Sequence, residues 1–144
     1  MRTYRVYLIE EEVAQLYFGR ERSLFNLFLE YVQTTGSLRD ILHKQIEYVT
    51  KIIPNEQVKK VIEQQKKQNF CYQNGGYYLE KNNGRSCATL WIHRDFVEIQ
   101  SSGDYVAETA FFECIRKCGP SFLAIDFDHE RFGWLKPIKE RKFV

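Results

Sequence analysis

The chain has 144 residues, 44% of them hydrophobic and 28% charged, with a net charge of +2 and a pI near 8.3. A chain of this length buries about 68–70% of its unfolded surface, so its core suffices for folding without a metal ion, cofactor or disulfide. The length favours a single domain over residues 1–144, and the weak net charge argues against direct binding to nucleic acid.

The chain also lacks the marks of a membrane or secreted protein. No stretch approaches the roughly 18 apolar residues of a membrane span, and the first residues, MRTYRV, contain no apolar core of a secretory signal. The four cysteines, Cys71, Cys87, Cys114 and Cys118, are then expected to be reduced thiols, because disulfides are rare in reducing compartments. We therefore predict a cytoplasmic protein.

The N-terminal third reads as one strand followed by helices. Residues 3–9 are rich in β-formers and predict a strand. Three glutamates then open a short helix over residues 11–18, which Gly19 ends. A second helix is predicted over residues 23–34, because its apolar residues recur at the spacing of one helix face.

A third helix is predicted from Ser37 to just before Pro54, and a fourth, more polar one begins at Asn55. On the third helix the sequence places five apolar residues on one side: Leu38, Ile41, Leu42, Ile46 and Val49. Such a stripe is typical of a helix that packs on a core.

The C-terminal half reads as an antiparallel meander, then a helix and a last strand. Turn signals at residues 74–76 and 82–84 separate strands expected at 77–81, 87–93 and 96–100. A central helix follows over residues 105–118, and a buried strand over 122–127. The final segment carries Phe132, Trp134 and Phe143, which predicts that it folds onto the domain, since disordered tails are poor in aromatics.

The predicted order is therefore β-α-α-α-α-β-β-β-α-β. This pattern indicates an α+β, or mixed α/β, fold in which helices flank a mixed parallel and antiparallel sheet.

No catalytic or metal-binding motif is recognisable, which favours a protein that is not an enzyme and acts through its surface. The alternative is a small nucleotide- or metal-binding enzyme that uses the loop at residues 101–104 and the acids at 126–130. Against it, Asp104 is placed to cap the following helix and to repel an anion. Asp126, Asp128 and Glu130 have Arg131 and Lys136 close by in sequence, which favours local salt bridges.

The short first helix carries a candidate docking surface. Val13 and Tyr17 are four residues apart and share a face, whereas Leu16 and Phe18 lie partly elsewhere on the helix. A helix this short cannot bury all of its apolar residues in one core. Spacing alone leaves two interpretations open: Tyr17 packs inward, or it belongs to an exposed patch.

Several segments resemble one known family. They are residues 7–21 (YLIEEEVAQLYFGRE), 44–48 (KQIEY), 102–113 (SGDYVAETAFFE), 122–127 (FLAIDF) and 131–144 (RFGWLKPIKERKFV). In this order and with these aromatic, glycine and proline positions, the chain resembles the sporulation inhibitor of replication (SirA) family of spore-forming bacilli. Residues 57–85 lie outside the resemblance.

The resemblance implies a monomeric cytoplasmic protein, with a sheet flanked by helices and without catalysis or cofactor. The resemblance also implies that the protein binds the N-terminal domain of the replication initiator DnaA and so blocks new rounds of chromosome replication during sporulation. Carried over by position, the partner-binding surface falls on Val13, Tyr17 and Gln45, with Leu16 and Tyr48 beside them. The family often has an aromatic residue where this chain has Val13. Pro137 matches a position that we expect to brace the tail.

Overall fold

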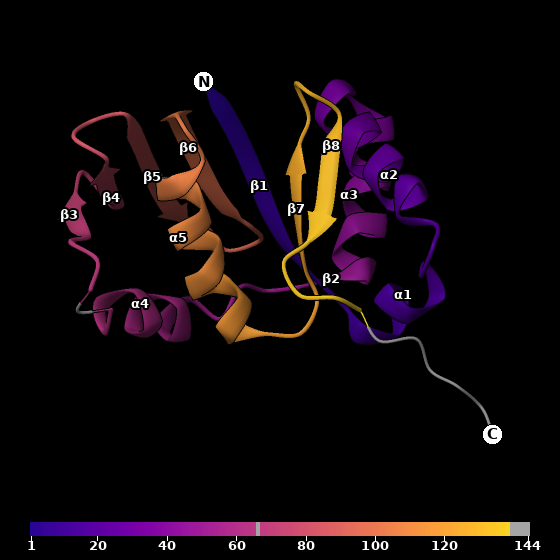
Figure 1. Ribbon diagram of the computed structural model, residues 1–144. Coiled ribbons are helices and arrows are strands. Elements are labelled where there is room, and N and C mark those ends of the chain that lie inside the picture. Colours follow the sequence, from indigo (N-terminus) through magenta and orange to yellow (C-terminus); the bar gives the residue numbers. More distant parts are fainter. Residues whose placement is uncertain (66, 139–144) are drawn as a thin grey trace.

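The strand β1 (Arg2–Ile9) lies at the centre of the fold in a computed structural model that describes residues 1–65 and 67–138. It pairs antiparallel with β6 (Val97–Gly103) on one side and with β7 (Phe122–Asp126) on the other. Figure 1 shows β1 running through the middle of the molecule, with the meander on one side and the C-terminal hairpin on the other. The first strand of the chain thereby joins segments that follow it by about ninety residues or more.

The strands form one eight-stranded sheet in the order β3-β4-β5-β6-β1-β7-β8, with β2 paired to β1 outside this path. The remaining strands are β2 (Thr50–Lys51), β3 (Cys71–Gln73), β4 (Gly76–Lys81), β5 (Ser86–Ile92) and β8 (Arg131–Trp134). The expected mixed sheet is wrong, because every strand pair described is antiparallel. The helix between β6 and β7 does join strands of the same direction, but β1 lies between them and runs the opposite way.

Helices cover both faces of this sheet. They are α1 (Glu11–Leu16), α2 (Glu21–Gln33), α3 (Ser37–Val49), α4 (Asn55–Glu63) and α5 (Val106–Ile115), which continues into a 3-10 turn, η1 (Arg116–Cys118). Successive β1 side chains point to opposite faces. Val6 and Leu8 pack with α4 and α5, whereas Tyr7 and Ile9 pack with α1, α2 and α3. The α+β class is therefore confirmed. No described helix has the length and apolarity to cross a membrane.

The C-terminal hairpin confirms that the segment carrying Phe132 and Trp134 packs on the domain. The ring of Phe132 on β8 stacks on that of Phe25 on α2, with centroids 5.1 Å apart. The indole N–H of Trp134 donates to a carboxylate oxygen of Glu21 at 3.3 Å. Phe143 lies outside the described residues. Strand β8 was not predicted, and neither were β2 and β3.

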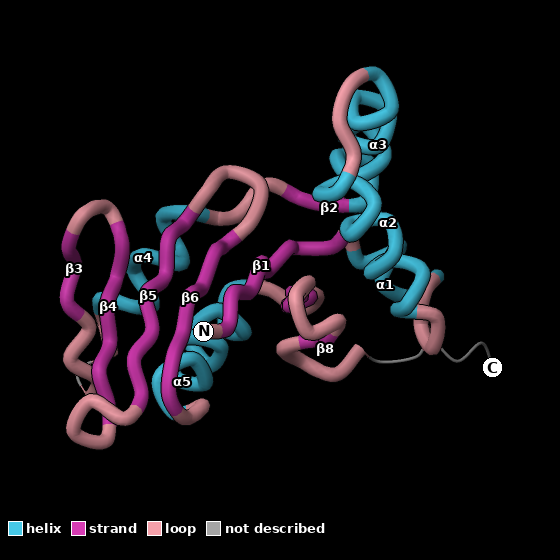
Figure 2. The backbone as a smooth tube through the Cα atoms, turned by 90° about the horizontal axis from the view of Figure 1, so that it is seen from above, coloured by secondary structure: helices cyan, strands magenta, loops and turns pink. Residues whose placement is uncertain are grey.

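The inward side of α3 is narrower than the sequence predicts. Leu42 and Ile46 are buried, but Leu38 and Ile41 are 46% and 56% exposed, so their predicted burial is wrong. Figure 2 shows the α2–α3 pair projecting beyond the strands of the sheet. Leu38 and Ile41 face away from the side of α3 on which Leu42 and Ile46 are buried.

Candidate functional site

A groove of about 440 Å³ lies between α1 and α3, with α2 contributing to it. Its lining residues are Val13, Leu16, Tyr17, Leu27, Lys44, Gln45, Tyr48 and Val49. All five residues that the resemblance assigned to the partner-binding surface are among them, although they come from two helices about thirty residues apart in sequence. The structure thus brings the expected site residues together in one hollow.

Ala14 is the one fully buried side chain of the short helix α1. Ala14 is buried in the same cluster as Phe25 and Phe28 of α2. Because a helix turns 100° per residue, burying Ala14 leaves Val13, Leu16 and Tyr17 on the sides of α1 that face α3 and solvent. Gly19, with a φ of +79°, then lets the chain turn sharply into α2.

The groove combines a half-buried floor with exposed rims. Val13 and Tyr17 are half-buried and pack against the core of the α1–α3 side, whereas Leu16 and Tyr48 are 64% and 82% exposed. The two interpretations left open for Tyr17 are both partly right, because its ring touches the core and also lines the groove. Arg20 lies over this ring at 5.5 Å from its centroid.

Three lining residues were not predicted: Leu27, Lys44 and Val49. Leu27 and Val49 read as core positions of their helices, and each is in fact only half-buried because its outer side faces the groove. Lys44 is exposed and adjoins Gln45 in the segment that carries the resemblance. The position of Lys44 next to Gln45 was the only signal in the sequence that could have predicted its place in the groove.

Pro137 lies beside α1 but outside this groove. With Lys136, Ile138 and Pro120 it borders a second hollow of about 380 Å³, whose other wall includes Glu11 and Ala14 of α1. The C-terminal segment therefore lies beside α1 and outside the α1–α3 groove. That Pro137 braces the tail stays a prediction.

The alternative phosphate site at residues 101–104 is closed by the protein's own groups. The backbone N–H of Val106 donates to a carboxylate oxygen of Asp104 at 3.1 Å, and that of Ala107 donates to the Ser86 hydroxyl at 2.8 Å. The bond from Val106 is the main reason that the pKa of Asp104 lies below its usual value. Ser101 and Ser102 belong to β6 instead of a loop. The first amides of α5 are thus already occupied.

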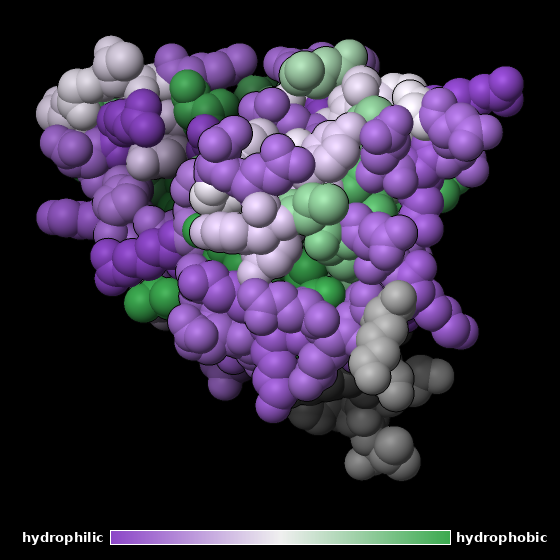
Figure 3. All heavy atoms as spheres, turned by 90° about the vertical axis from the view of Figure 1, so that its left-hand side faces the viewer, coloured by the Kyte–Doolittle hydropathy of each residue, from purple (hydrophilic) through white to green (hydrophobic). Residues whose placement is uncertain are grey.

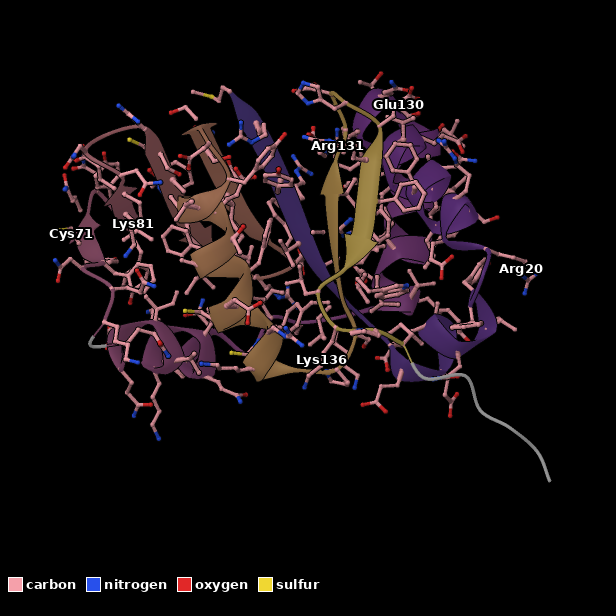
Figure 4. The ribbon with its side chains drawn as sticks, in the orientation of Figure 1. Arg20, Cys71, Lys81, Glu130, Arg131 and Lys136 are labelled. Carbon is pink, nitrogen blue, oxygen red and sulfur yellow. The ribbon has the colours of Figure 1, made fainter. Side chains whose placement is uncertain are left out.

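Asp126 at the end of β7 and the two acids after it do not converge on one point. Asp126 is buried and accepts hydrogen bonds from Arg131 and from the His129 ring, both at 2.8 Å. Burial alone would raise the pKa of Asp126, but these hydrogen bonds outweigh it and hold the pKa below its usual value. Figure 4 shows Arg131 and Glu130 at the end of the β7–β8 hairpin, and Asp128 and Glu130 are exposed. Within residues 1–65 and 67–138, no three His, Cys, Asp or Glu side chains gather as a metal site.

The cysteines are thiols without a shared site. Cys114 and Cys118 are buried one turn apart, and the Cys118 thiol donates to the Cys114 carbonyl oxygen at 3.6 Å. Burial raises the pKa of Cys114 to about 11, so this thiol stays protonated and unreactive near neutral pH. Cys71 and Cys87 lie on β3 and β5, away from this pair.

Comparison with known proteins places the whole chain in one family. The model of the family described as sporulation inhibitor of replication protein SirA matches residues 2–139. The chain belongs to the SirA family. A relative named sporulation inhibitor of replication protein SirA, from Bacillus subtilis (strain 168), is 40% identical over 149 residues, covering 99% of each chain. The SirA match includes residues 57–85, for which the sequence alone suggested no resemblance.

Proposed function

We propose that this protein inhibits the initiation of chromosome replication during sporulation by binding the N-terminal domain of DnaA through the α1–α3 groove. The inhibitor role follows from membership of the SirA family and from the name of its 40% identical relative. The observation that supports the site is the convergence of Val13, Leu16, Tyr17, Gln45 and Tyr48 on one groove.

The groove has the composition of a protein-binding site. Tyrosine is enriched at the centre of protein interfaces, where its ring supplies contact area and its hydroxyl a hydrogen bond. Here Tyr17 is anchored by core contacts, and Tyr48 stands almost fully in solvent. The exposed Tyr48 beside the partly buried Tyr17 is what we expect of a surface that a partner protein covers. The small groove suits an interface at or below about 1,600 Å² of total buried area.

Gln45 would set the orientation of the partner. Its carboxamide carries one acceptor and two donors, and it is exposed in the free protein. Covering it without a hydrogen bond would cost about 1–3 kcal/mol. A partner must therefore present matching polar groups at this point of an otherwise apolar surface.

The mechanism we propose is occlusion: a protein seated on the N-terminal domain of DnaA denies that surface to other factors. No chemical step is involved.

The test is calorimetry of this protein against the isolated N-terminal domain of DnaA from the same organism, with two variants. Tyr17→Ala should weaken binding by about 1–4 kcal/mol. Tyr72→Ala is the control, because Tyr72 is also exposed but lies on β3, at the opposite end of the sheet. Figure 3 views that end, where hydrophilic side chains predominate.

Binding by the wild type and by Tyr72→Ala, but not by Tyr17→Ala, would support both the partner and the groove. Equal binding by the wild type and both variants would support DnaA as the partner but would place the binding site outside the groove. A folded wild type that fails to bind would overturn the proposal.

A further inference from the structure

Helix α3 carries a second apolar stripe on its outer side. Leu38, Ile41, Gln45 and Tyr48 are all exposed and follow one another at steps of three, four and three residues. Residues three and four apart are neighbours on one side of a helix, so the four side chains lie along one side of α3. The inward residues Leu42 and Ile46 lie on a different side.

This outer stripe runs out of the groove along α3. Gln45 and Tyr48 line the groove, whereas Ile41 and Leu38 lie one and two turns nearer the start of α3. The line from Leu38 to Tyr48 is about 15 Å long at 1.5 Å per residue. Ile46 and Val49 pack α3 against the core, and Leu42 is buried, so the outer residues are not the main attachment of this helix. An apolar stripe that the fold leaves exposed marks an interaction surface.

The charges beside the groove indicate what would cover it. Lys44 lines the groove on α3, and Arg20 sits over the ring of Tyr17, its guanidinium donating to the Leu16 carbonyl at 2.7 Å. Figure 4 shows Arg20 on the loop after α1. Among the described residues, neither cation forms a salt bridge with a carboxylate. An apolar line flanked by two such cations complements an apolar ridge flanked by acids.

The spacing of the stripe favours a helix as the covering element. Side chains three and four residues apart form ridges that pack into the grooves of a second helix. Apolar helices that bind in grooves use anchors at the same intervals. A strand, with its repeat of two residues, would stay in register with the stripe over only a few residues.

We propose that the α1–α3 groove and the outer stripe of α3 form one continuous seam for a single amphipathic helix of the partner. The apolar ridge of that helix lies along Leu38, Ile41 and Tyr48, Gln45 fixes its register, and its carboxylates face Arg20 and Lys44. The inference rests on the proposed function and specifies the part of the partner that is bound.

The test uses two positions outside the five residues expected from the resemblance. Ile41→Asp places a charge on the stripe beyond the groove, and Lys44→Glu reverses a cation on its rim. Both should weaken binding to the DnaA N-terminal domain about tenfold or more. The Lys44→Glu effect should shrink as salt rises from low to physiological strength and beyond, because exposed charge pairs are screened.

Two control variants introduce the same acidic residues at other exposed positions. Val106→Asp alters an exposed apolar residue of α5, and Lys60→Glu an exposed lysine of α4. Both should bind within about twofold of the wild type, since neither lies near α1 or α3. Circular dichroism melts of all four variants separate lost binding from lost folding.

The possible outcomes separate the two proposals. If Tyr17→Ala loses binding but Ile41→Asp and Lys44→Glu bind as the wild type, the seam is overturned and the proposed function stands. If the folded wild type does not bind, both fall. Sedimentation of the protein alone tests whether a second copy of this chain binds the stripe instead. If the protein self-associates and Ile41→Asp abolishes the self-association, the proposal of a partner helix is overturned.

Discussion

The backbone N–H of Glu10 donates a hydrogen bond to the carbonyl oxygen of Val49 at 2.9 Å. This bond joins the residue before α1 to the last residue of α3, so it ties together the two walls of the groove. It continues the β1–β2 pairing, in which Ile9 lies opposite Thr50 and Leu8 opposite Lys51. The spacing between the walls is therefore set by backbone geometry.

A proline scan across the start of α1 should reveal this bond. Glu10 has a φ of −55°, which proline adopts without strain, so Glu10→Pro removes the donor N–H and little else. Glu11→Pro is the matched control, because proline is favoured at the first position of a helix and no bond between elements is lost there. Glu10→Pro and Glu11→Pro lower the conformational entropy of the unfolded chain to a similar extent, so this effect cancels when the two are compared.

We expect Glu10→Pro to be less stable than Glu11→Pro by about 0.5–1.5 kcal/mol in urea unfolding. Glu10→Ala corrects for the exposed pair of Glu10 and Lys51 at 4.0 Å, which contributes at most about 1 kcal/mol. Calorimetry with the DnaA domain should show weaker binding for Glu10→Pro as well. Equal stability and binding of the two proline variants would mean that this bond does not hold the groove.

The stack of Phe25 on Phe132 should be a major attachment of the C-terminal hairpin. Phe25 is fully buried, and Phe25→Ala should lower the free energy of unfolding by about 3–5 kcal/mol. Phe18→Ala is the control: Phe18 is exposed, and its loss should cost less than about 1 kcal/mol. A double-mutant cycle of Phe25 and Phe132 should give a coupling of about 0.5–1.5 kcal/mol. Zero coupling would show that the rings do not stabilise each other.

Asp126 should make stability depend on acid pH. The unfolded chain binds this proton near the ordinary pKa of 3.8, whereas in the folded protein the Arg131 and His129 hydrogen bonds outweigh burial and keep the pKa lower. The stabilisation is therefore complete above the ordinary pKa and is lost as the pH falls toward the folded pKa. Asp126→Asn should cost about 1–3 kcal/mol at neutral pH.

The difference in unfolding free energy between the wild type and Asp126→Asn should stay constant down to about pH 5 and narrow below about pH 4. Asp128→Asn, an exposed change in the same turn, should run parallel to the wild type throughout. A difference that does not change with pH would mean that the carboxylate keeps its ordinary pKa in the folded protein.

Much of the fold could be predicted from local patterns, because β1, the helices and the β4–β6 meander each carry their own periodicity or turn residues. The relative direction of the strands in the sheet could not be predicted in this way. That β1 inserts between β6 and β7 depends on contacts about ninety residues or more apart. The two residues of β2 and the four of β8 are too short for any periodicity to appear.

The candidate site too was predicted only in part from the sequence. Resemblance supplied five positions, but only the tertiary arrangement shows that they share a groove with Lys44 and Leu27. Leu38 and Ile41 were assigned to the core because helical spacing identifies apolar sides without saying which of two adjacent sides is covered. A helix with apolar residues on both sides reads as one wide stripe.

The last prediction concerns the loop before α5, where an enzyme would hold a phosphate. Asp104 and Ser86 already accept from the amides of Val106 and Ala107, and an anion there would meet the Asp104 carboxylate. We therefore expect no thermal stabilisation of the wild type by ATP, ADP or phosphate, with or without Mg²⁺.

Asp104→Ala should instead lower the melting temperature slightly, because its carboxylate no longer accepts the hydrogen bond from the Val106 N–H. Asp95→Ala, an exposed change in the turn before β6, serves as the control and should be nearly neutral. Clear stabilisation of the wild type by a nucleotide would contradict this account. Ser102→Ala changes the exposed end of β6. If this variant lost the stabilisation by nucleotide, residues 101–104 would be assigned to nucleotide binding.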